Sequence, residues 1–282
     1  MKSLCYSTKE ELIEVCYNAL NNNYNEDKVK EIKESIESEF SDNIYDNKFF
    51  KYLPMREIRK GLMKDLDVSQ YAKLEFEEYQ MKQIRLGLEN GVDVSVYADK
   101  KYNELQMEAI REGLESGVDV SIYSDNESYN GYQMREIRKG LEKNLNINVY
   151  SDPKFTWDEM SEIRRGLEEG IDVSIFSNYN YSSLQMGIIS QGLKEGLDVS
   201  VYAKPEYDWS QMYEIRYGLL HKLDVSLYAN PKFSRGQMEE IRLGLLEGLD
   251  VSVYADTKYT VLEMKEIRRC LMNKEDYSKL LK

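Results

Sequence analysis

The chain has 282 residues, 32% of them charged and 41% hydrophobic, and 51 acidic against 38 basic residues give a formal net charge of −13. This charge argues against nucleic acid and anionic lipid as partners and is more easily matched by a basic or neutral protein. Three cysteines without a CxxC spacing argue against a disulfide framework or a thiolate metal site. No run of eighteen apolar residues occurs, so we expect a soluble, cytoplasmic protein without membrane contact.

The first 49 residues are predicted to begin a helical array. Residues 1–23 supply one helix, around residues 12–20, which we expect to cap the array. Residues 24–49 are a diverged copy of the unit that fills the rest of the chain. The matching positions of this copy hold Tyr24, Asn25, Val29, Ile32, Ser35, Ile36, Phe40 and Tyr45.

Nine methionines then mark a repeat, each 26 residues after the last except for one step of 27. They are Met55, Met81, Met107, Met134, Met160, Met186, Met212, Met238 and Met264. A fixed period of this size is typical of a stacked array in which each unit contacts mainly its neighbours. Residues 50–282 therefore hold nine clearer copies, and residues 24–282 are predicted to form one all-α solenoid of about ten units.

Each unit contains the signals of a long helix. A polar N-cap lies four residues before the methionine, a Gln or Glu follows three residues after this cap, and an aromatic residue precedes it, as in Phe233, Ser234 and Gln237. This is a capping box with a hydrophobic staple. Apolar residues at offsets 0, 3 and 7 from the methionine share one helix face, and a glycine such as Gly248 ends the run. The pattern predicts a helix of about thirteen residues.

The segment Leu-Asp-Val-Ser-x-Tyr-Ala that follows has two interpretations. It can be a second short helix capped by its aspartate, as at Asp250, with a proline soon after in several units. It can also alternate like a strand, which would make the array an α/β solenoid similar to a leucine-rich repeat. The helical version is favoured because the staple spacing recurs, and an extra residue within residues 124–132 predicts one local irregularity.

Two further positions recur inside the long helix. Arginine lies four residues after most of the methionines, and we interpret it as structural, bonding to the aspartate eight residues on or to helix-end carbonyls. Glycine lies two residues after the arginine, where it costs roughly 1 kcal/mol relative to alanine. We interpret this glycine as the point where adjacent units touch, and a phosphate-binding loop would instead precede a helix.

The candidate binding residues are those that break the consensus on the predicted outer face. Offsets 1, 2, 5, 8 and 9 hold charged residues in most units, but from Met186 onward several become apolar or aromatic, and Ser190 replaces the arginine. The candidate contact residues for a protein partner are Ile188, Tyr213, Tyr217, Leu220, His221, Leu243 and Leu246. Exposed Tyr and Leu rimmed by charge are typical of an interface hot spot, although burial against a neighbouring unit is the equal alternative.

Catalysis has little support in the sequence. The single histidine, His221, has no nucleophile motif beside it, and no HExxH, GxSxG, P-loop or GxGxxG pattern occurs. The acidic residues are expected on the solvated helix face rather than in an acid–base pair. We therefore predict no enzyme, no cofactor and no metal site.

The unit QMxxIRxGLxxGLDVSxYA resembles a tandem-repeat family of Gram-positive gut bacteria and their phages and mobile elements, and the resemblance covers nearly the whole chain. It implies no residue roles, but it favours a part in conflict between mobile elements and hosts over housekeeping metabolism. The first functional hypothesis is thus a protein-binding scaffold. The second is an acidic anti-defence inhibitor that blocks a nucleic-acid-binding or immune protein with rows of carboxylates such as Glu89, Glu115, Glu142 and Glu168.

Overall fold

The computed structural model describes residues 53–62, 64–73, 75–125 and 128–281, and the predicted helix at 1–23 and diverged copy at 24–49 lie outside these ranges. The chain divides into two compact units, Met1–Asn144 and Leu145–Lys282. No strand occurs in the described ranges. The all-helical prediction is therefore confirmed, and the leucine-rich-repeat alternative is wrong.

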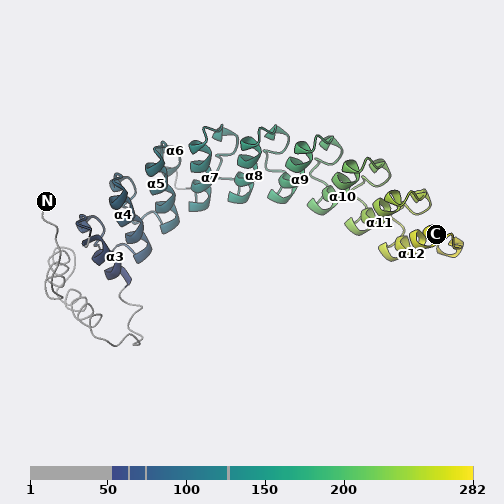
Figure 1. Ribbon diagram of the computed structural model, residues 1–282, viewed down its shortest axis with the longest axis horizontal. Coiled ribbons are helices and arrows are strands. Elements are labelled where there is room, and N and C mark those ends of the chain that lie inside the picture. Colours follow the sequence, from purple (N-terminus) through teal and green to yellow (C-terminus); the bar gives the residue numbers. More distant parts are fainter. Residues whose placement is uncertain (1–52, 63, 74, 126–127, 282) are drawn as a thin grey trace, which may run out of the picture. The chain divides into compact units, whose positions relative to one another are not determined.

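In both units a long α-helix alternates with one short helical turn (Figure 1). The described part of the first unit contains α3 (Leu53–Leu62), η2 (Val68–Gln70), α4 (Glu78–Asn90), η3 (Val94–Val96), α5 (Glu104–Ser116), α6 (Ser121–Ser124) and α7 (Gly131–Glu142). The second contains η4 (Ile147–Val149), α8 (Trp157–Glu168), η5 (Val173–Ile175), α9 (Ser183–Lys194), η6 (Val199–Val201), α10 (Trp209–Leu220), η7 (Val225–Leu227), α11 (Arg235–Leu246), η8 (Val251–Val253), α12 (Val261–Asn273) and η9 (Ser278–Leu280). Within each unit every long helix packs against the next one along the chain.

The helix boundaries follow the predicted capping signals. In α10, for example, Asp208 accepts from the backbone N–H groups of Ser210 and Gln211, and the Gln211 side chain accepts from the N–H of Asp208. The same capping box begins α5, α7, α8, α9, α11 and α12. At the far end Gly91, Gly117, Gly170, Gly196 and Gly248 have φ between 69° and 76°. Both predicted ends of the helix are confirmed.

The Leu-Asp-Val-Ser-x-Tyr segment forms a 3₁₀ helix, labelled η, in most repeats. Its aspartate caps it: Asp224 accepts from the backbone N–H and the hydroxyl of Ser226, at 3.1 and 2.5 Å. Burial favours the same segment, because Val225 is buried and Tyr228 is fully buried, with its hydroxyl donating to the carbonyl of Glu214 inside α10. The short element is therefore held by one cap and one tyrosine.

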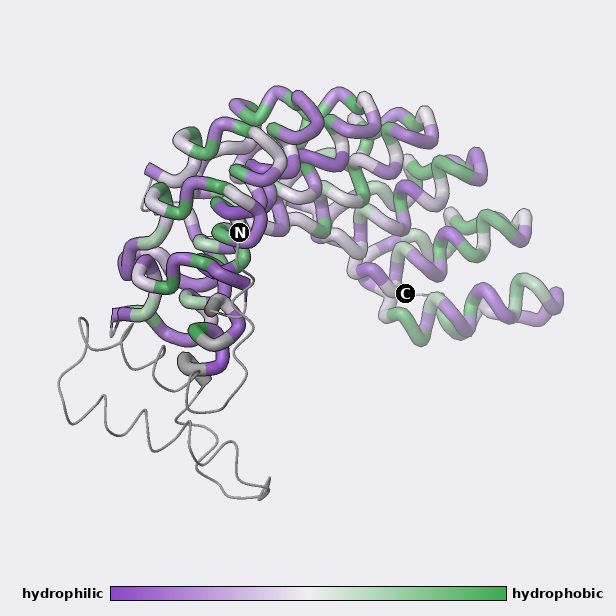
Figure 2. Tube along the Cα trace, turned by 60° about the vertical axis from the view of Figure 1, so that its left-hand side comes forward, coloured by the Kyte–Doolittle hydropathy of each residue, from purple (hydrophilic) through white to green (hydrophobic). Residues whose placement is uncertain are grey.

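In each unit the core is a row of the same few side chains. The Met and Ile of each described repeat, the aromatic residue before the cap and the Tyr or Phe of the short helix are all buried where their burial is described. Figure 2 shows hydrophobic and hydrophilic residues alternating along the helices, as an amphipathic pattern requires. Among the described residues no helix is both long and apolar enough to cross a bilayer.

The recurring glycine has a different role from the one predicted. A Cβ on Gly218 would overlap the hydroxyl of Tyr228 and lie 2.8 Å from Cγ1 of Val225, and both residues belong to the short helix of the same repeat. Gly87, Gly113, Gly192 and Gly244 meet the matching Tyr and Val in the same way. The prediction that this glycine marks the contact between adjacent units is wrong, because it accommodates the tyrosine of its own unit.

The extra residue of the third step between methionines, from Met107 to Met134, changes one junction, between α5 and α7. The short element there is α6, a single α-helical turn, and a Cβ on Gly131 would lie 2.6 Å from the carbonyl carbon of Leu105. The backbones of these two helices therefore approach closely. The predicted local irregularity is thus present, and the absence of a side chain at residue 131 makes the approach possible.

Candidate functional site

Within each unit the capping glutamine, where present, also links its repeat to the next one. The Gln211 amide accepts from its own helix cap and donates through Nε2 to the carbonyl of Phe233, 2.6 Å away and 22 residues further on. Equivalent bonds run from Gln80 to Tyr102, Gln106 to Tyr129, Gln185 to Tyr207 and Gln237 to Tyr259. At residue 159 the capping residue is a glutamate, which still completes its cap but has no N–H to donate to the repeat of α9.

The recurring arginine forms a second link, which we call the arginine ladder. Arg242 of α11 donates from Nε to the carboxylate of Glu214 in α10 at 2.7 Å, and Glu214 is fully buried. Equivalent rungs join Arg85 to Glu57, Arg111 to Gln83 and Arg268 to Glu240, each across 28 residues. The structural interpretation of this arginine is supported, but its predicted partner is wrong. The partners are an acceptor two residues after the preceding methionine and, in several helices, a glutamate four residues after the arginine.

This geometry corrects the prediction for offset 2, which was placed on the solvent-facing side. Glu57, Gln83, Ala109, Glu136, Glu214 and Glu240 occupy that offset and are all buried. These residues therefore belong to the junction between repeats rather than to a free acidic face. Arg85 shows the consequence: ion pairs with Glu57 and Glu89 raise the pKa of its guanidinium although burial alone would lower it.

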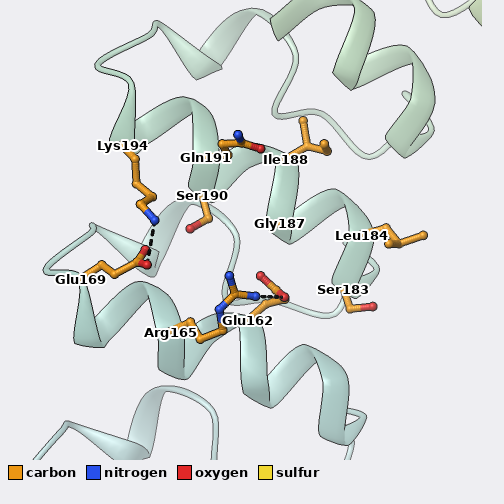
Figure 3. Close-up of a pocket in the computed structure, with 10 residues that line it drawn as sticks. All are labelled: Glu162, Arg165, Glu169, Ser183, Leu184, Gly187, Ile188, Ser190, Gln191 and Lys194. Atoms are coloured by element: carbon orange, nitrogen blue, oxygen red, sulfur yellow. Dashed lines mark hydrogen bonds and ion pairs between the residues drawn. The ribbon is translucent and has the colours of Figure 1, made fainter. Parts of the chain in front are cut away.

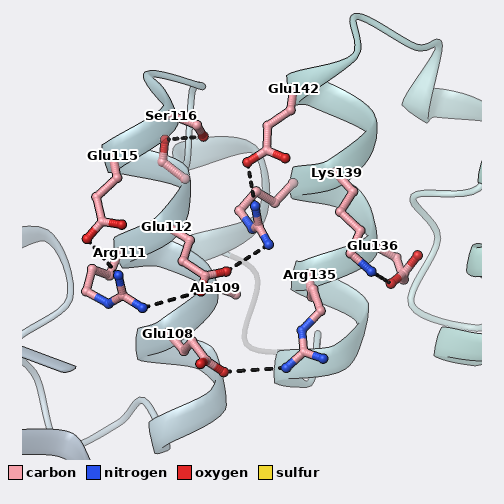
Figure 4. A network of polar contacts seen from close by, with 12 residues as sticks. Glu108, Ala109, Arg111, Glu112, Glu115, Ser116, Arg135, Glu136, Lys139 and Glu142 are labelled. Carbon is pink, nitrogen blue, oxygen red and sulfur yellow. Dashed lines mark hydrogen bonds and ion pairs between the residues drawn. The ribbon is translucent and has the colours of Figure 1, made fainter. Parts of the chain in front are cut away.

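Within the two units, the ladder lacks a rung at three junctions. In the first unit Ala109 offers no acceptor, so the buried Nε of Arg138 has no hydrogen-bond partner. The terminal nitrogens of Arg138 still pair with Glu112, at 2.8 Å, and with Glu142. Figure 4 labels these two glutamates together with Ala109. The close approach of α5 and α7 near Gly131 favours the small side chain of Ala109, which is 2% exposed. Packing therefore accounts for this first gap.

The other two gaps flank α9. On its α8 side Glu162 keeps the acceptor position, but Ser190 stands where the arginine would be. On its α10 side Arg216 is present, but Ile188 occupies the acceptor position, and Arg216 instead forms two bonds to Glu195, at 2.9 and 2.5 Å. The repeat from Met186 thus supplies neither the donor nor the acceptor of an arginine rung.

A cleft of about 450 Å³ lies between α8 and α9 at the missing arginine, which we call the α8–α9 cleft. Glu162, Arg165 and Glu169 line one side, and Ser183, Leu184, Gly187, Ile188, Ser190, Gln191 and Lys194 line the other (Figure 3). Arg165 pairs with Glu162 at 2.7 Å, and Lys194 pairs with Glu169 at 2.7 Å. Burial, together with the nearby charges of Glu169 and Asp158, raises the pKa of Glu162 despite the guanidinium of Arg165.

Four of the predicted contact residues form an exposed surface on α10 and α11. Leu220, Leu246 and Tyr213 are 44%, 41% and 37% exposed, and His221 is exposed. Tyr213, Tyr217 and His221 lie in one column, with ring centroids 6.2 and 4.2 Å apart. We call Tyr213, Tyr217, Leu220, His221 and Leu246 the α10–α11 patch.

The half-buried ring of Tyr217 contacts Arg242 as well as the stacked ring of His221. The guanidinium of Arg242 lies 4.4 Å from its centroid, and His221 Nδ1 is 2.8 Å from the Tyr217 carbonyl oxygen. Leu243 is likewise half-buried, and Ile188 lines the α8–α9 cleft instead of joining the patch. Of the seven predicted residues, five therefore belong to the α10–α11 patch, Ile188 lines the α8–α9 cleft, and Leu243 belongs to neither.

Sequence reasoning missed a row of exposed apolar residues in the first turns of the helices. In the first unit these are Tyr79 and Tyr132, and in the second Trp157, Leu184, Trp209 and Leu262, with exposures from 43% to 77%. The signal was visible at the second or third residue before six of the nine methionines. It varies between Tyr, Trp and Leu and alternates between two offsets, so it does not stand out as a consensus position.

Comparison of the chain with protein-family models, with curated proteins and with solved structures found no match. The arrangement of its own residues is therefore the basis for a functional proposal. Most pKa shifts in the described part have a structural cause that recurs with the repeat, such as the buried tyrosines and the aspartate caps. Glu162, beside the missing rung, differs from the other shifted carboxyl groups of the described part because its pKa is raised.

Proposed function

We propose that this protein is a non-enzymatic scaffold that binds a partner protein through the α10–α11 patch. The observation that carries this proposal is the column of Tyr213, Tyr217 and His221, in which Tyr213 and His221 are exposed, together with exposed Leu220 on α10 and Leu246 on α11. Aromatic rings that are already held in place lose little conformational entropy on binding, and Tyr and Trp are enriched among interface residues that dominate affinity. Arg242 provides this hold, because it stacks on Tyr217 while bonded to Glu214.

The acidic-inhibitor alternative receives less support from the same contacts. Its carboxylate row was Glu89, Glu115, Glu142 and Glu168, and each of them pairs with an arginine four residues earlier in its own helix. A mimic of nucleic acid needs carboxylates whose charge is uncompensated. We therefore keep a protein-binding scaffold as the proposal, and a part in conflict between mobile elements and hosts remains a hypothesis from the resemblance of the repeat.

Affinity capture from the native host tests the proposal. The tagged protein should retain a specific partner, and the triple variant Tyr213→Ala, Leu220→Ala and Leu246→Ala should lose it, because interface residues of this kind cost roughly 1–4 kcal/mol when truncated. The control is Leu262→Ala with Met272→Ala on α12, which removes exposed apolar side chains outside the patch. Equal capture by the triple variant, or equal loss in the control, would contradict the assignment of the patch.

A further inference from the structure

The α8–α9 cleft occupies a position that an arginine fills elsewhere in the array. At the rungs of Arg85, Arg242 and Arg268 a guanidinium of one helix lies on a carboxylate of the preceding helix, at 2.7–2.9 Å. At α8–α9 the carboxylate of Glu162 is retained while Ser190 replaces the guanidinium. The acceptor half of a rung is thus present without its donor, and open space takes the place of the missing side chain.

Glu57 shows what the second cation contributes at an intact rung. Glu57 and Glu162 occupy the same offset, and each pairs at 2.7 Å with a cation three residues on, Lys60 and Arg165. Glu57 also binds Arg85, and its pKa is lowered even though burial opposes this. Glu162 has no arginine from the next helix, and its pKa is raised. A second cation beside Glu162 would therefore be favourable, as it is beside Glu57.

The walls of the cleft suit an arginine side chain better than a small cation. Leu184, 57% exposed, and Ile188 offer apolar surface to an aliphatic stem, and the absence of a side chain at Gly187 leaves room beside Glu162. A Cβ at Gly187 would lie 3.4 Å from Oε2 of Glu162, so this oxygen lies close to α9 at the position where α9 has no side chain (Figure 3). Ser183, Ser190 and Gln191 add hydrogen-bonding groups around it. A volume of about 450 Å³ is within the usual range for ligand sites.

We propose that the α8–α9 cleft receives an arginine side chain of the partner protein, whose guanidinium binds Glu162 where every intact rung holds an internal arginine. This inference rests on the proposed scaffold function and states the chemistry of part of the partner. The planar guanidinium is preferred to an ammonium group because it can bind a carboxylate with two parallel hydrogen bonds and is more weakly hydrated. Ser190 thus leaves the Glu162 carboxylate, which keeps its pair with Arg165, without the arginine of the next helix, so that a partner molecule can supply this second cation.

The first test is an NMR titration of the whole protein with the peptide acetyl-Ala-Arg-Ala-amide. We expect shifts confined to α8 and α9, with binding at least about tenfold tighter than for the same peptide carrying neutral citrulline or lysine. Equal binding of the citrulline peptide would overturn the ion pair, and equal binding of the lysine peptide would overturn the preference for guanidinium. Shifts distributed over the whole surface would overturn the site.

Two variants locate the interaction. Ser190→Arg restores the internal rung and should abolish peptide binding while raising the melting temperature, and Glu162→Gln should weaken binding at least about tenfold. The controls are Thr257→Arg and Glu206→Gln, which make the same changes at exposed positions away from the cleft. Because Ser190→Arg is expected to stabilise the fold, its result stands even if Glu162→Gln does not fold. Unchanged peptide binding in Ser190→Arg would refute the proposal.

Capture of the partner separates this inference from the proposed function. If the triple patch variant loses the partner but Ser190→Arg retains it, the scaffold function stands and the arginine site is refuted. If the triple patch variant retains the partner while it and the native protein bind the arginine peptide equally, the patch is refuted and the cleft stands. Loss of the partner in both variants supports both proposals.

Discussion

Substitution of Gly218 by alanine is the sharpest test of how the two helices of a repeat fit together. An added Cβ would overlap the hydroxyl of Tyr228 and lie 2.8 Å from Cγ1 of Val225. The tyrosine ring is fully buried and its hydroxyl donates to the carbonyl of Glu214 at 3.2 Å. The ring must therefore move, and it cannot do so without losing this bond or displacing core neighbours.

Three contributions set the expected magnitude. Alanine in place of glycine within a helix stabilises by roughly 1 kcal/mol. Overpacking of a core opposes this by roughly 1–3 kcal/mol, and loss of the tyrosine hydrogen bond costs about 1 kcal/mol more. Gly218→Ala should therefore lower the free energy of unfolding by about 1–3 kcal/mol. Tyr228→Phe alone should lower it by about 1 kcal/mol.

The double variant decides whether the overlap is the cause. Removal of the hydroxyl makes room for the new Cβ, so Gly218→Ala with Tyr228→Phe should be more stable than the sum of the single losses by about 1–2 kcal/mol. Urea unfolding followed by circular dichroism gives the free energies of unfolding of the two single variants and the double variant. Unchanged m-values show that the three transitions are comparable. Gly166→Ala is the natural control, because it faces Phe176, whose Cζ would lie 3.2 Å from the Cβ. Additive losses would refute the reasoning.

Three further results are expected. Gln211→Glu should keep its helix cap but lose the bond to the carbonyl of Phe233, which lowers the free energy of unfolding by about 1–2 kcal/mol. Glu159→Gln should instead raise the melting temperature, because it adds the missing bond to the next repeat. A melting temperature of Glu159→Gln equal to that of the native protein would contradict the role of the capping glutamine as a link between repeats. Gly131→Ala should cost roughly 1–3 kcal/mol because its Cβ would lie 2.6 and 2.8 Å from backbone atoms of Leu105 and Gln106; Gly187→Ala, which meets only the Glu162 side chain at 3.4 Å, should be neutral or stabilising. Burial raises the pKa of five tyrosines, Tyr97, Tyr123, Tyr202, Tyr228 and Tyr254. Their contribution to the free energy of unfolding is therefore complete below the pKa of an unfolded tyrosine, about 10, and decreases as the pH rises above that value. The urea midpoint should drop steeply from about pH 10 upward, and a flat profile would contradict this.

The sequence predicts the long helices well because each boundary is written in nearby residues. The cap at Asp208 and the left-handed glycine at Gly248 act within one helical turn, so their spacing alone is informative. The pairing of Gly218 with Tyr228 was missed because the two residues are ten positions apart and the contact depends on how the 3₁₀ helix folds back. Only the structure shows that Gly218 makes room for the tyrosine of its own repeat rather than for a neighbouring repeat.

The candidate site was predictable where it depends on residues close together in the sequence. Tyr213, Tyr217 and His221 share one helix face at a spacing of four, so their column follows from the sequence. The α8–α9 cleft does not, because the arginine ladder joins residues 28 positions apart, and offset 2 was taken to face solvent. The replacement of arginine by Ser190 was visible in the sequence, but its meaning required knowing that Glu162 lies opposite.

The bonds of the arginine ladder and of the capping glutamines reach one repeat along the chain and no further. A typical copy carries one donor and one acceptor of each kind, so recombination can insert or delete whole copies and the bonds re-form with the new neighbour. The copy containing Ser190 and Ile188 behaves differently. Its deletion would bring Arg216 opposite Glu162, complete the rungs of the second unit and erase the cleft. Within the second unit, one divergent copy therefore distinguishes a single position among repeats that are otherwise interchangeable.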